Sequence, residues 1–301
     1  MYKHLPVMLN ECIETLNIKP DGIYLDLTLG RAGHSAAILK KLKTGLLIAF
    51  DKDIDAIKES GPILSNISDN FKLVHSDFKN IENELAKLNI TKVDGVLVDL
   101  GVSSPQIDQS HRGFSYNKDA KLDMRMDQKQ ELSAHNIVNE WDRERLIKIF
   151  QYNADVKFFL SERIANAIIE KRPIDTTLQL ADIVRESLPA AVVRKKNMCK
   201  PIFQAIRMEV NNELDSIRVI LKKTLDLLNA DGVFVVITFH SIEDKIVKKY
   251  FHNLAKDDSG QIPIVPEKSY IFKTKKPNFE ETQENNRSRS ARLRILRKVS
   301  E

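Results

Sequence analysis

Residues 26–34 read Asp26-Leu27-Thr28-Leu29-Gly30-Arg31-Ala32-Gly33-His34, and this segment decides the fold of the chain. It joins a short apolar run, residues 23–28, to apolar residues at helical spacing over residues 35–43. We therefore expect a strand, a tight turn and a helix. Gly30 and Gly33 allow positive φ and a close approach of the backbone. The free amide groups where the helix begins, near His34, suit a ligand carboxylate or phosphate.

The same alternation continues along the chain. Apolar runs at residues 45–50, 71–75, 93–100 and 232–238 predict further strands, and residues 53–59 and the segment from Ser241 predict helices between or after them. Near-continuous apolar runs are typical of buried parallel strands. We expect an α/β protein with an open sheet, helices on both faces, and ligands beyond the carboxyl ends of the strands.

The alternation breaks after Pro105. Residues 133–140, 143–150, 155–171 and 177–188 have amphipathic helical spacing, and residues 203–228 predict one long helix or two short ones. The sequence therefore predicts a discontinuous sheet domain, residues 1–105 plus 204–301, and an inserted helical domain, residues 106–203.

Composition places the chain among ordinary globular proteins, with 301 residues, 42% hydrophobic and 30% charged. No run of about 18 apolar residues and no apolar signal core occur, so we expect a cytoplasmic protein that does not enter a membrane. Cys12 and Cys199 lack metal-ligand spacing. We expect them to be buried, inert thiols, with neither a metal nor a disulfide.

The charge favours a polyanionic partner, since the formal net charge is +5. Residues 286–298 carry six basic side chains and no acid. Arg292 and Arg294 alternate there with Leu293 and Ile295, which predicts a half-buried strand. Two interpretations stay open, an edge strand protected by charge and a contact with RNA.

The first turn favours a nucleoside ligand over a dinucleotide. Ala32 stands where the fingerprint of dinucleotide enzymes has its middle glycine. Asp51 ends the second strand, where an acid can accept hydrogen bonds from ribose hydroxyls. Phe78 follows the third strand and could lie against an adenine, although alone it would more often belong to the core. Asp99 ends the fourth strand. The alternative is a turn whose glycines serve geometry only.

The segment Asp99-Leu100-Gly101-Val102-Ser103-Ser104-Pro105-Gln106 indicates the reaction. Amino-methyltransferases carry Asp, Asn or Ser followed by Pro-Pro and an aromatic residue at this place. An exocyclic amine on a base is a poor nucleophile, so acceptors must hold its hydrogens. The Ser104 hydroxyl and the carbonyl before Pro105 can do this, and positioning supplies much of the acceleration without a metal. The alternative is a turn that merely ends a strand. Neither cysteine ends a central strand, which argues against methylation at cytosine carbon 5.

The whole chain resembles the bacterial family of 16S ribosomal RNA cytosine-N4 methyltransferases, RsmH, also called MraW. The matching segments are residues 2–4, 30–35, 94–106, 112–115, 122–127, 203–207, 210–214 and 239–244. The resemblance implies a Rossmann-like class I methyltransferase sheet, S-adenosylmethionine as cofactor, and a helical insert that recognises the substrate. It also implies that Gly30, Ala32, Gly33, His34, Asp51, Phe78, Asp99 and Gln106 bind the cofactor.

The product implied by the resemblance is N4-methylated cytidine at position 1402 of 16S rRNA in the 30S subunit, made by a monomer or homodimer that does not act on DNA. Two departures stand out: Ala32 replaces a usual glycine, and Asn286 stands where a proline usually precedes the Arg-Ser-Arg-Ser tail. Neither removes a polar contact. Ala32 raises the question of whether its backbone adopts positive φ.

Several further residues have two interpretations each. Ser104, Pro105 and His240 are the candidate catalytic residues, but His240 and Ser241 also suit an ordinary helix start. Residues 112–116 and 123–127 could place an aromatic ring on a flipped cytosine and an arginine on a phosphate, or could pack the insert. Residues 194–196 fit a solvated loop or an RNA contact.

Three other functions compete. A binding-only assembly factor should lack cofactor groups, yet Asp51 and Asp99 are present. An NAD oxidoreductase should have the middle glycine that Ala32 replaces. A DNA amino-methyltransferase is the nearest enzymatic alternative, and the whole-chain resemblance alone argues against it.

Overall fold

The computed structural model describes residues 6–256 and 269–299, except the side chain of Ser104. The chain divides into two compact units, a sheet unit of residues 1–101 and 215–301 and a helical unit of residues 102–214. Both boundaries differ from the expected 105/106 and 203/204. The helix α11 (Cys199–Val210) lies inside the helical unit because its apolar face, including Ile202, Phe203 and Ile206, belongs to that unit's core.

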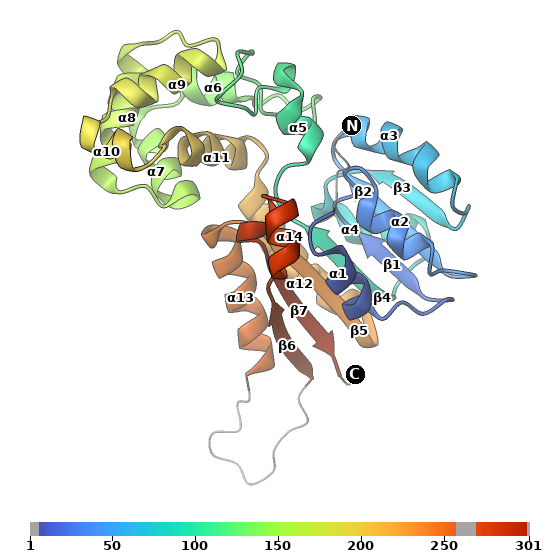
Figure 1. Ribbon diagram of the computed structural model, residues 1–301. Helices are drawn as coiled ribbons and strands as arrows, with labels where there is room; N and C mark the ends of the chain where they lie inside the picture. Colours follow the sequence, from blue (N-terminus) through green and yellow to red (C-terminus); the bar gives the residue numbers. More distant parts are fainter. Residues whose placement is uncertain (1–5, 257–268, 300–301) are drawn as a thin grey trace. The chain divides into compact units, whose positions relative to one another are not determined.

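The sheet unit is built on one seven-stranded sheet in the order β3-β2-β1-β4-β5-β7-β6 (Figure 1). Its strands are β1 (Ile23–Asp26), β2 (Leu46–Asp51), β3 (Phe71–His75), β4 (Val93–Asp99), β5 (Leu228–Thr238), β6 (Tyr270–Lys275) and β7 (Arg292–Lys298). The strands β1 to β5 pair in parallel, and β7 pairs antiparallel with both β5 and β6. The expected open α/β sheet, with helices on both faces, is confirmed.

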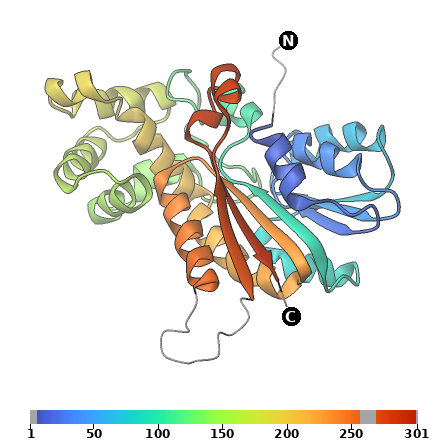
Figure 2. The same cartoon turned by 60° about the horizontal axis from the view of Figure 1, so that its bottom comes forward.

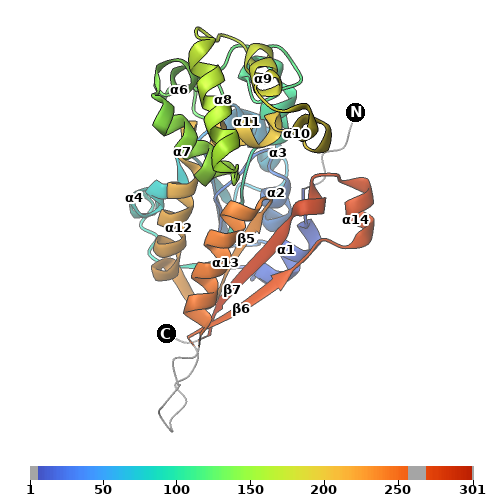
Figure 3. The same ribbon diagram turned by 90° about the vertical axis from the view of Figure 1, so that its left-hand side faces the viewer.

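Helices cover both faces of this sheet because its strands alternate their side chains between the faces. On one face Val233, Val235 and Ile237 of β5 share a core with Cys12 of α1 (Leu9–Leu16) and Ile38 of α2 (Gly33–Leu39). On the other, Phe234 of β5 contacts Phe251 of α13 (Ser241–Ala255), with ring centroids 5.3 Å apart. Figure 3 shows α13 and α1 on opposite sides of these strands.

The remaining elements of the sheet unit connect its strands. They are α3 (Ile54–Ser65), η1 (Phe78–Asn80), α4 (Ile81–Lys87), α12 (Glu213–Leu227), α14 (Phe279–Glu284) and η3 (Ser288–Ser290). The first residues of α12 fall in the helical unit. Lys223 of α12 pairs with Glu82 of α4 at 2.7 Å, so these two helices lie side by side. Figure 2 shows β5 and β7 running along each other.

The C-terminal basic strand is not an edge strand, which corrects that interpretation. The strand β7 lies between β5 and β6, and β6 forms the edge. Arg294 of β7 is only 7% exposed and forms a bidentate ion pair with Asp244 of α13, with nitrogen–oxygen distances of 2.8 and 2.7 Å. Its charge therefore stabilises a packed strand. The sequence did not reveal β6, because Lys273, Thr274 and Lys275 make it too polar to read as a strand.

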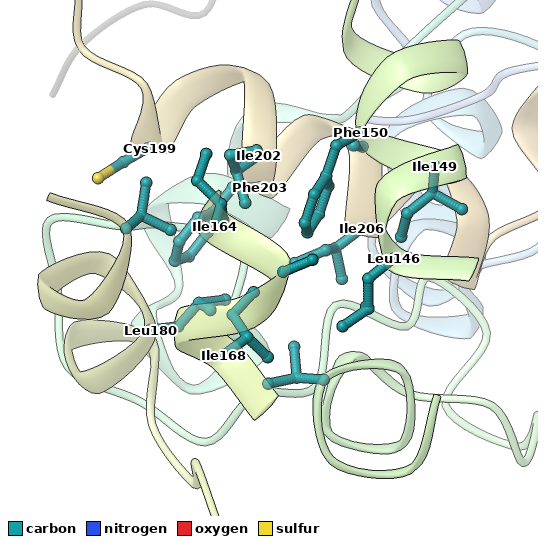
Figure 4. Packing of buried hydrophobic residues seen from close by; sticks show 14 of the residues in the cluster. Leu146, Ile149, Phe150, Ile164, Ile168, Leu180, Cys199, Ile202, Phe203 and Ile206 are labelled. Atoms are coloured by element: carbon teal, nitrogen blue, oxygen red, sulfur yellow. The ribbon is translucent and has the colours of Figure 1, made fainter. Parts of the chain in front are cut away.

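The helical unit has a core of its own, shown in part in Figure 4. Its elements are α5 (Ser104–Asp108), η2 (Ser110–Arg112), α6 (Ala134–Glu140), α7 (Arg143–Ala154), α8 (Phe158–Glu170), α9 (Thr177–Glu186), α10 (Ala190–Lys195) and α11. Leu146 and Phe150 of α7, Ile164 of α8 and Ile206 of α11 meet in this core. The four helices expected between residues 133 and 188 are present.

Candidate active site

The candidate site of the sheet unit lies at the carboxyl ends of β1 and β4. These strands are neighbours, but the chain continues from β1 to β2 on one side and from β4 to β5 on the other. Such a switch in strand order leaves a crevice beyond the strand ends, where open α/β sheets bind their ligands. The first turn follows β1, and Asp99 ends β4.

Hydrogen bonds tie the first turn to the end of β2. The Gly30 N–H donates to Asp51 Oδ2 at 2.9 Å, and the Asp53 N–H donates to Asp51 Oδ1 at 2.9 Å. Ser60 Oγ donates to the Gly30 carbonyl at 2.9 Å. Burial raises the pKa of Asp51 to about 6, against the lowering effect of the two amide donors. The structure thus brings Gly30 and Asp51 together, as the cofactor interpretation requires.

The backbone of the turn is left-handed at two positions. Gly30 has φ 49°, and Ala32, the residue before α2, has φ 59° and ψ 18°. Ala32 therefore adopts the conformation that a glycine would adopt without cost, and for an L-residue this conformation costs about 1–2 kcal/mol. Gly33 is needed for a different reason, since a Cβ there would lie 2.2 Å from Cγ of Pro6.

His34 is buried between the N-terminal segment and β4. Its Nε2 lies 3.0 Å from the Val7 carbonyl, and its Nδ1 lies 3.9 Å from Asp99 Oδ2. A carbonyl oxygen only accepts, so Nε2 carries a proton and donates it to the Val7 carbonyl, while Nδ1 faces Asp99. The Asp99 N–H donates to Thr28 Oγ1 at 2.7 Å, which fixes the end of β4 to the first turn. The sequence did not point to Thr28.

Asp99 has a carboxyl oxygen in need of a donor. Its Oδ1 is buried and has no hydrogen-bond partner within residues 6–256 and 269–299. Burial, reinforced by the negative charges of Asp26 and Glu243, raises the pKa of Asp99 well above its ordinary value. A buried polar atom without a partner costs about 1–3 kcal/mol, and a bound ligand that donates to it removes this cost. The site is therefore suited to a ligand with a donor or a positive charge near Asp99.

Phe78 begins η1, which follows β3 after Ser76 and Asp77. Its ring is half-buried. Asp77 caps η1 by accepting from the Lys79 N–H at 2.9 Å, and its other oxygen accepts from Ser216 of α12 at 3.3 Å. These contacts hold the segment that carries Phe78.

His240 precedes α13, after β5. Its Nε2 lies 2.9 Å from Oε2 of Glu243, whose side chain is 1% exposed. Oε1 of Glu243 accepts from the backbone N–H groups of Phe239 and His240. Both ring nitrogens of His240 are buried without a hydrogen-bond partner in the described part of the chain, so its Nε2 lies near Glu243 without a hydrogen bond to it. Glu243, which the sequence indicated only as a helix-start residue, thus holds the backbone that carries the candidate catalytic histidine.

The reactive segment begins the helical unit. Ser104 begins α5, and its side chain lies outside what the structure describes. Pro105 occupies the first turn of α5, where its missing N–H costs nothing. Gln106 Oε1 accepts from the Ser103 N–H at 3.1 Å in a capping box. Gln106 therefore has a structural role in this helix start, whatever else it contacts.

The two arginine motifs that follow hold the helical unit together. Arg112 is 2% exposed and donates from Nη2 to the carbonyls of Arg125 and Met126, each at 3.1 Å. Arg125 pairs with both oxygens of Asp123, at 3.0 and 2.7 Å. The Asn211 side chain accepts from the Met126 N–H at 2.8 Å. Of the two interpretations of these motifs, packing of the insert accounts for Arg112 and Arg125.

Other sequence expectations concern thiols, metals and membranes. Cys12 and Cys199 are free and buried, and burial raises the pKa of both thiols.

Within the described ranges no group of three or more His, Cys, Asp or Glu side chains could hold a metal ion. No helix among these residues is long and apolar enough to cross a bilayer. The matching segment at residues 2–4 lies outside the described residues.

Comparison with known proteins shows the family to which the chain belongs. A family model described as the MraW methylase family matches residues 1–299. The chain is 56% identical to the ribosomal RNA small subunit methyltransferase H of Mycoplasmopsis agalactiae over 99% of each chain. It is 52% identical to the protein of that name from Mycoplasmopsis pulmonis, covering 99% of this chain and all of the relative. A solved rRNA methylase from Streptococcus thermophilus aligns over 99% of this chain and all of its own, with 10% identity and a TM-score of 0.47. The chain therefore belongs to the MraW methylase family and is a methyltransferase.

Proposed function

We propose that this protein transfers a methyl group from S-adenosylmethionine to the exocyclic N4 amine of a cytidine in 16S rRNA, at the position equivalent to 1402, in the small ribosomal subunit. The names of the curated relatives support an rRNA substrate, and the resemblance of the segment at residues 99–106 supports the amine. We further propose a cytoplasmic location, where that substrate is found.

One observation carries the cofactor assignment: at the switch in strand order, Asp99 has a buried carboxyl oxygen without a partner among the residues that the structure describes. S-adenosylmethionine bears an amino group and a sulfonium, and when bound it supplies the methyl group. In this proposal Asp99 accepts from the cofactor's amine, Asp51 accepts from its ribose hydroxyls, and Phe78 lies against its adenine. Gly30, Ala32, Gly33 and His34 shape the turn that approaches it, and Gln106 is a further contact.

The remaining chemistry concerns the target amine. The N4 lone pair would form the new N–CH3 bond as the S–CH3 bond of the methyl donor breaks and its thioether leaves, and the nitrogen would then lose one proton. We assign the orientation of the amine to Ser104 and to the carbonyl preceding Pro105. We assign the proton to His240, because neither of its ring nitrogens has a hydrogen-bond partner among the described residues, which leaves a ring nitrogen to accept it.

The decisive experiment measures tritiated methyl transfer from S-adenosylmethionine to 30S particles, naked 16S rRNA and DNA, followed by nucleoside analysis. We expect N4-methylcytidine from an RNA substrate only. Appearance of 5-methylcytidine, or labelling of DNA alone, would contradict the proposal.

In the same assay His240→Gln should lower kcat about 100-fold or more and leave the KM for S-adenosylmethionine unchanged. An unchanged kcat would remove His240 from the reaction.

A further inference from the structure

The helical unit carries an open groove that the candidate active site does not use. The groove encloses about 290 Å³, and all of its lining residues belong to α7, α11 and the residue after α6. The lining residues that matter here are the aromatic Trp141 and Tyr152, the basic Arg145 and Lys148, and the polar Asn153 and Glu209.

The spacing of α7 places these side chains on one face. Arg145, Lys148 and Tyr152 are three and four residues apart, so they lie one above another along the helix. Leu146 and Phe150 point instead into the core, where Figure 4 shows them opposite Ile206. Packing of α7 thus places two basic side chains, Arg145 and Lys148, and the aromatic Tyr152 in one stripe outside the core.

The side chains of Arg145, Lys148 and Tyr152 are exposed, so the two positive charges can contact a ligand. Tyr152 is 68% exposed. The Arg145 guanidinium carbon lies 3.7 Å from the centre of the Trp141 ring. Within the described part of the chain neither Arg145 nor Lys148 forms an ion pair with an acid. Their neighbour Arg143 differs, since it pairs with Glu162 and Glu144. The charge of Arg143 is satisfied, whereas those of Arg145 and Lys148 face solvent.

We propose that this groove binds an unpaired nucleotide of the RNA substrate, at a second contact separate from the methylated base. Aromatic faces stack on bases of any sequence, and lysine and arginine neutralise the adjoining phosphates. The inference rests on the proposed function for the identity of the RNA.

The one acid in the lining is consistent with a nucleotide. Glu209 Oε2 accepts from Asn153 Nδ2 at 3.0 Å. A carboxylate has further acceptor capacity for an amino group on a base edge. An acidic peptide would use the two basic side chains but would leave the aromatic faces with nothing to stack on. The combination of charge and ring faces therefore favours RNA.

The test uses the single tryptophan of the chain. Because this residue is Trp141, intrinsic tryptophan fluorescence reports on the groove alone. Titration with an unstructured single-stranded RNA oligonucleotide should change the emission to saturation. Tyr152→Ala should raise the Kd about five-fold or more, and Lys148→Gln should reduce the slope of log K against log salt by about 0.7. The controls are Phe158→Ala, in α8, and Lys157→Gln, at the residue before it, two exposed positions outside the lining, which should change neither quantity.

In this titration, three outcomes would overturn the inference. The first is that RNA binds, as shown by filter retention, without changing the emission of Trp141. The second is that Tyr152→Ala leaves the Kd unchanged and Lys148→Gln leaves the salt slope unchanged. The third concerns an acidic polypeptide. Polyglutamate can change the emission as strongly as RNA, which would assign the groove to an acidic polypeptide.

Methylation kinetics separate this inference from the proposed function. With 30S particles, Tyr152→Ala should raise the KM for the particle and leave unchanged both kcat and the KM for S-adenosylmethionine. If the wild type methylates 30S and the variant has the same KM, the groove inference fails alone. If the wild type methylates no RNA, the proposed function fails, and the fluorescence titration still decides whether the groove binds RNA.

Discussion

Two buried carboxyl groups at strand ends of the sheet unit differ in how their oxygens are satisfied. Both oxygens of Asp51 accept backbone amides from Gly30 and Asp53. Asp99 keeps one oxygen without a partner among the described residues. Burial raises the pKa of both groups, but the amide donors restrain the shift at Asp51. Asp51 is therefore the group that titrates close to neutral pH.

We predict that cofactor affinity depends on pH through Asp51. Its pKa in the free protein is about 6, and the ionised form is the one that accepts hydroxyl hydrogen bonds without restriction. Affinity for S-adenosylmethionine should therefore rise as the pH increases from 5 to 7 and then level off. Binding at pH 6 should release a proton, which calorimetry in buffers of different ionisation enthalpy measures.

Asp51→Asn is the control for this pH dependence. It should remove the proton release at pH 6 and weaken binding about ten-fold or more, since a hydrogen bond to a charged group contributes about 1.5–3 kcal/mol. Unchanged affinity would exclude the ribose role of Asp51.

In the wild type the raised pKa of Asp51 also lowers the free energy of unfolding as the pH rises from about 4 to about 6, because the native state holds a proton that the unfolded state releases.

At the scale of elements, β7 shows how a basic strand can belong to a sheet interior. Arg294 is accommodated because Asp244 of α13 receives its guanidinium with two hydrogen bonds, and Thr274 of β6 receives a third at 2.7 Å. Arg294 also lowers the pKa of Asp244 against the effect of burial. The pair links β7, α13 and β6.

We predict that Arg294→Met destabilises the protein by about 3 kcal/mol, because it leaves Asp244 without its partner. The measurement is urea unfolding at pH 7. Arg289→Met changes an exposed side chain of the same basic segment and should cost less than about 0.5 kcal/mol. If the two variants were equally stable, the ion pair would contribute nothing to the strand.

The sequence predicted those elements whose apolar pattern is strong. The strands β1 to β5, the helices α6 to α9 and the thiols of Cys12 and Cys199 follow from local spacing and burial. It could not predict that β7 is an interior strand, because that depends on the polar strand β6 and on the partner of Arg294. In the site, Gly30 and Asp51 were predicted as a pair. Thr28 was not, because its contact is with Asp99, which is distant in the chain. Glu243 was not, because an acid in the first turn of a helix is common and does not indicate a contact with the segment of His240.

At the scale of the whole molecule, the two units have separate hydrophobic cores. The helical unit's core draws its residues from 122–210, and the principal core of the sheet unit draws none from that range. Each unit therefore has its own source of stability, and a cavity in one core should act mainly on that unit.

We predict that Ile164→Ala, in the helical unit's core, lowers the stability of that unit by about 2–5 kcal/mol. Hydrogen exchange measured by mass spectrometry should show faster exchange of α11 amides and unchanged exchange of β4 amides. Ile38→Ala, in the sheet unit's core, should do the reverse. Equal acceleration of both sets of amides in either variant would show that the units unfold together.

The place of the helical unit between β4 and β5 also sets the order in which the chain can fold during its own synthesis. The edge of β4 that pairs with Phe234–Ile237 of β5 has no neighbour until the helical unit and α12 have been made. At about 5–20 residues per second, this takes on the order of 10 s. During that time the apolar residues of β4, Val96 to Val98, form an open strand edge of the kind that promotes aggregation. A nascent chain is therefore most exposed to misassembly in this interval, which ends when β5 is added to the sheet.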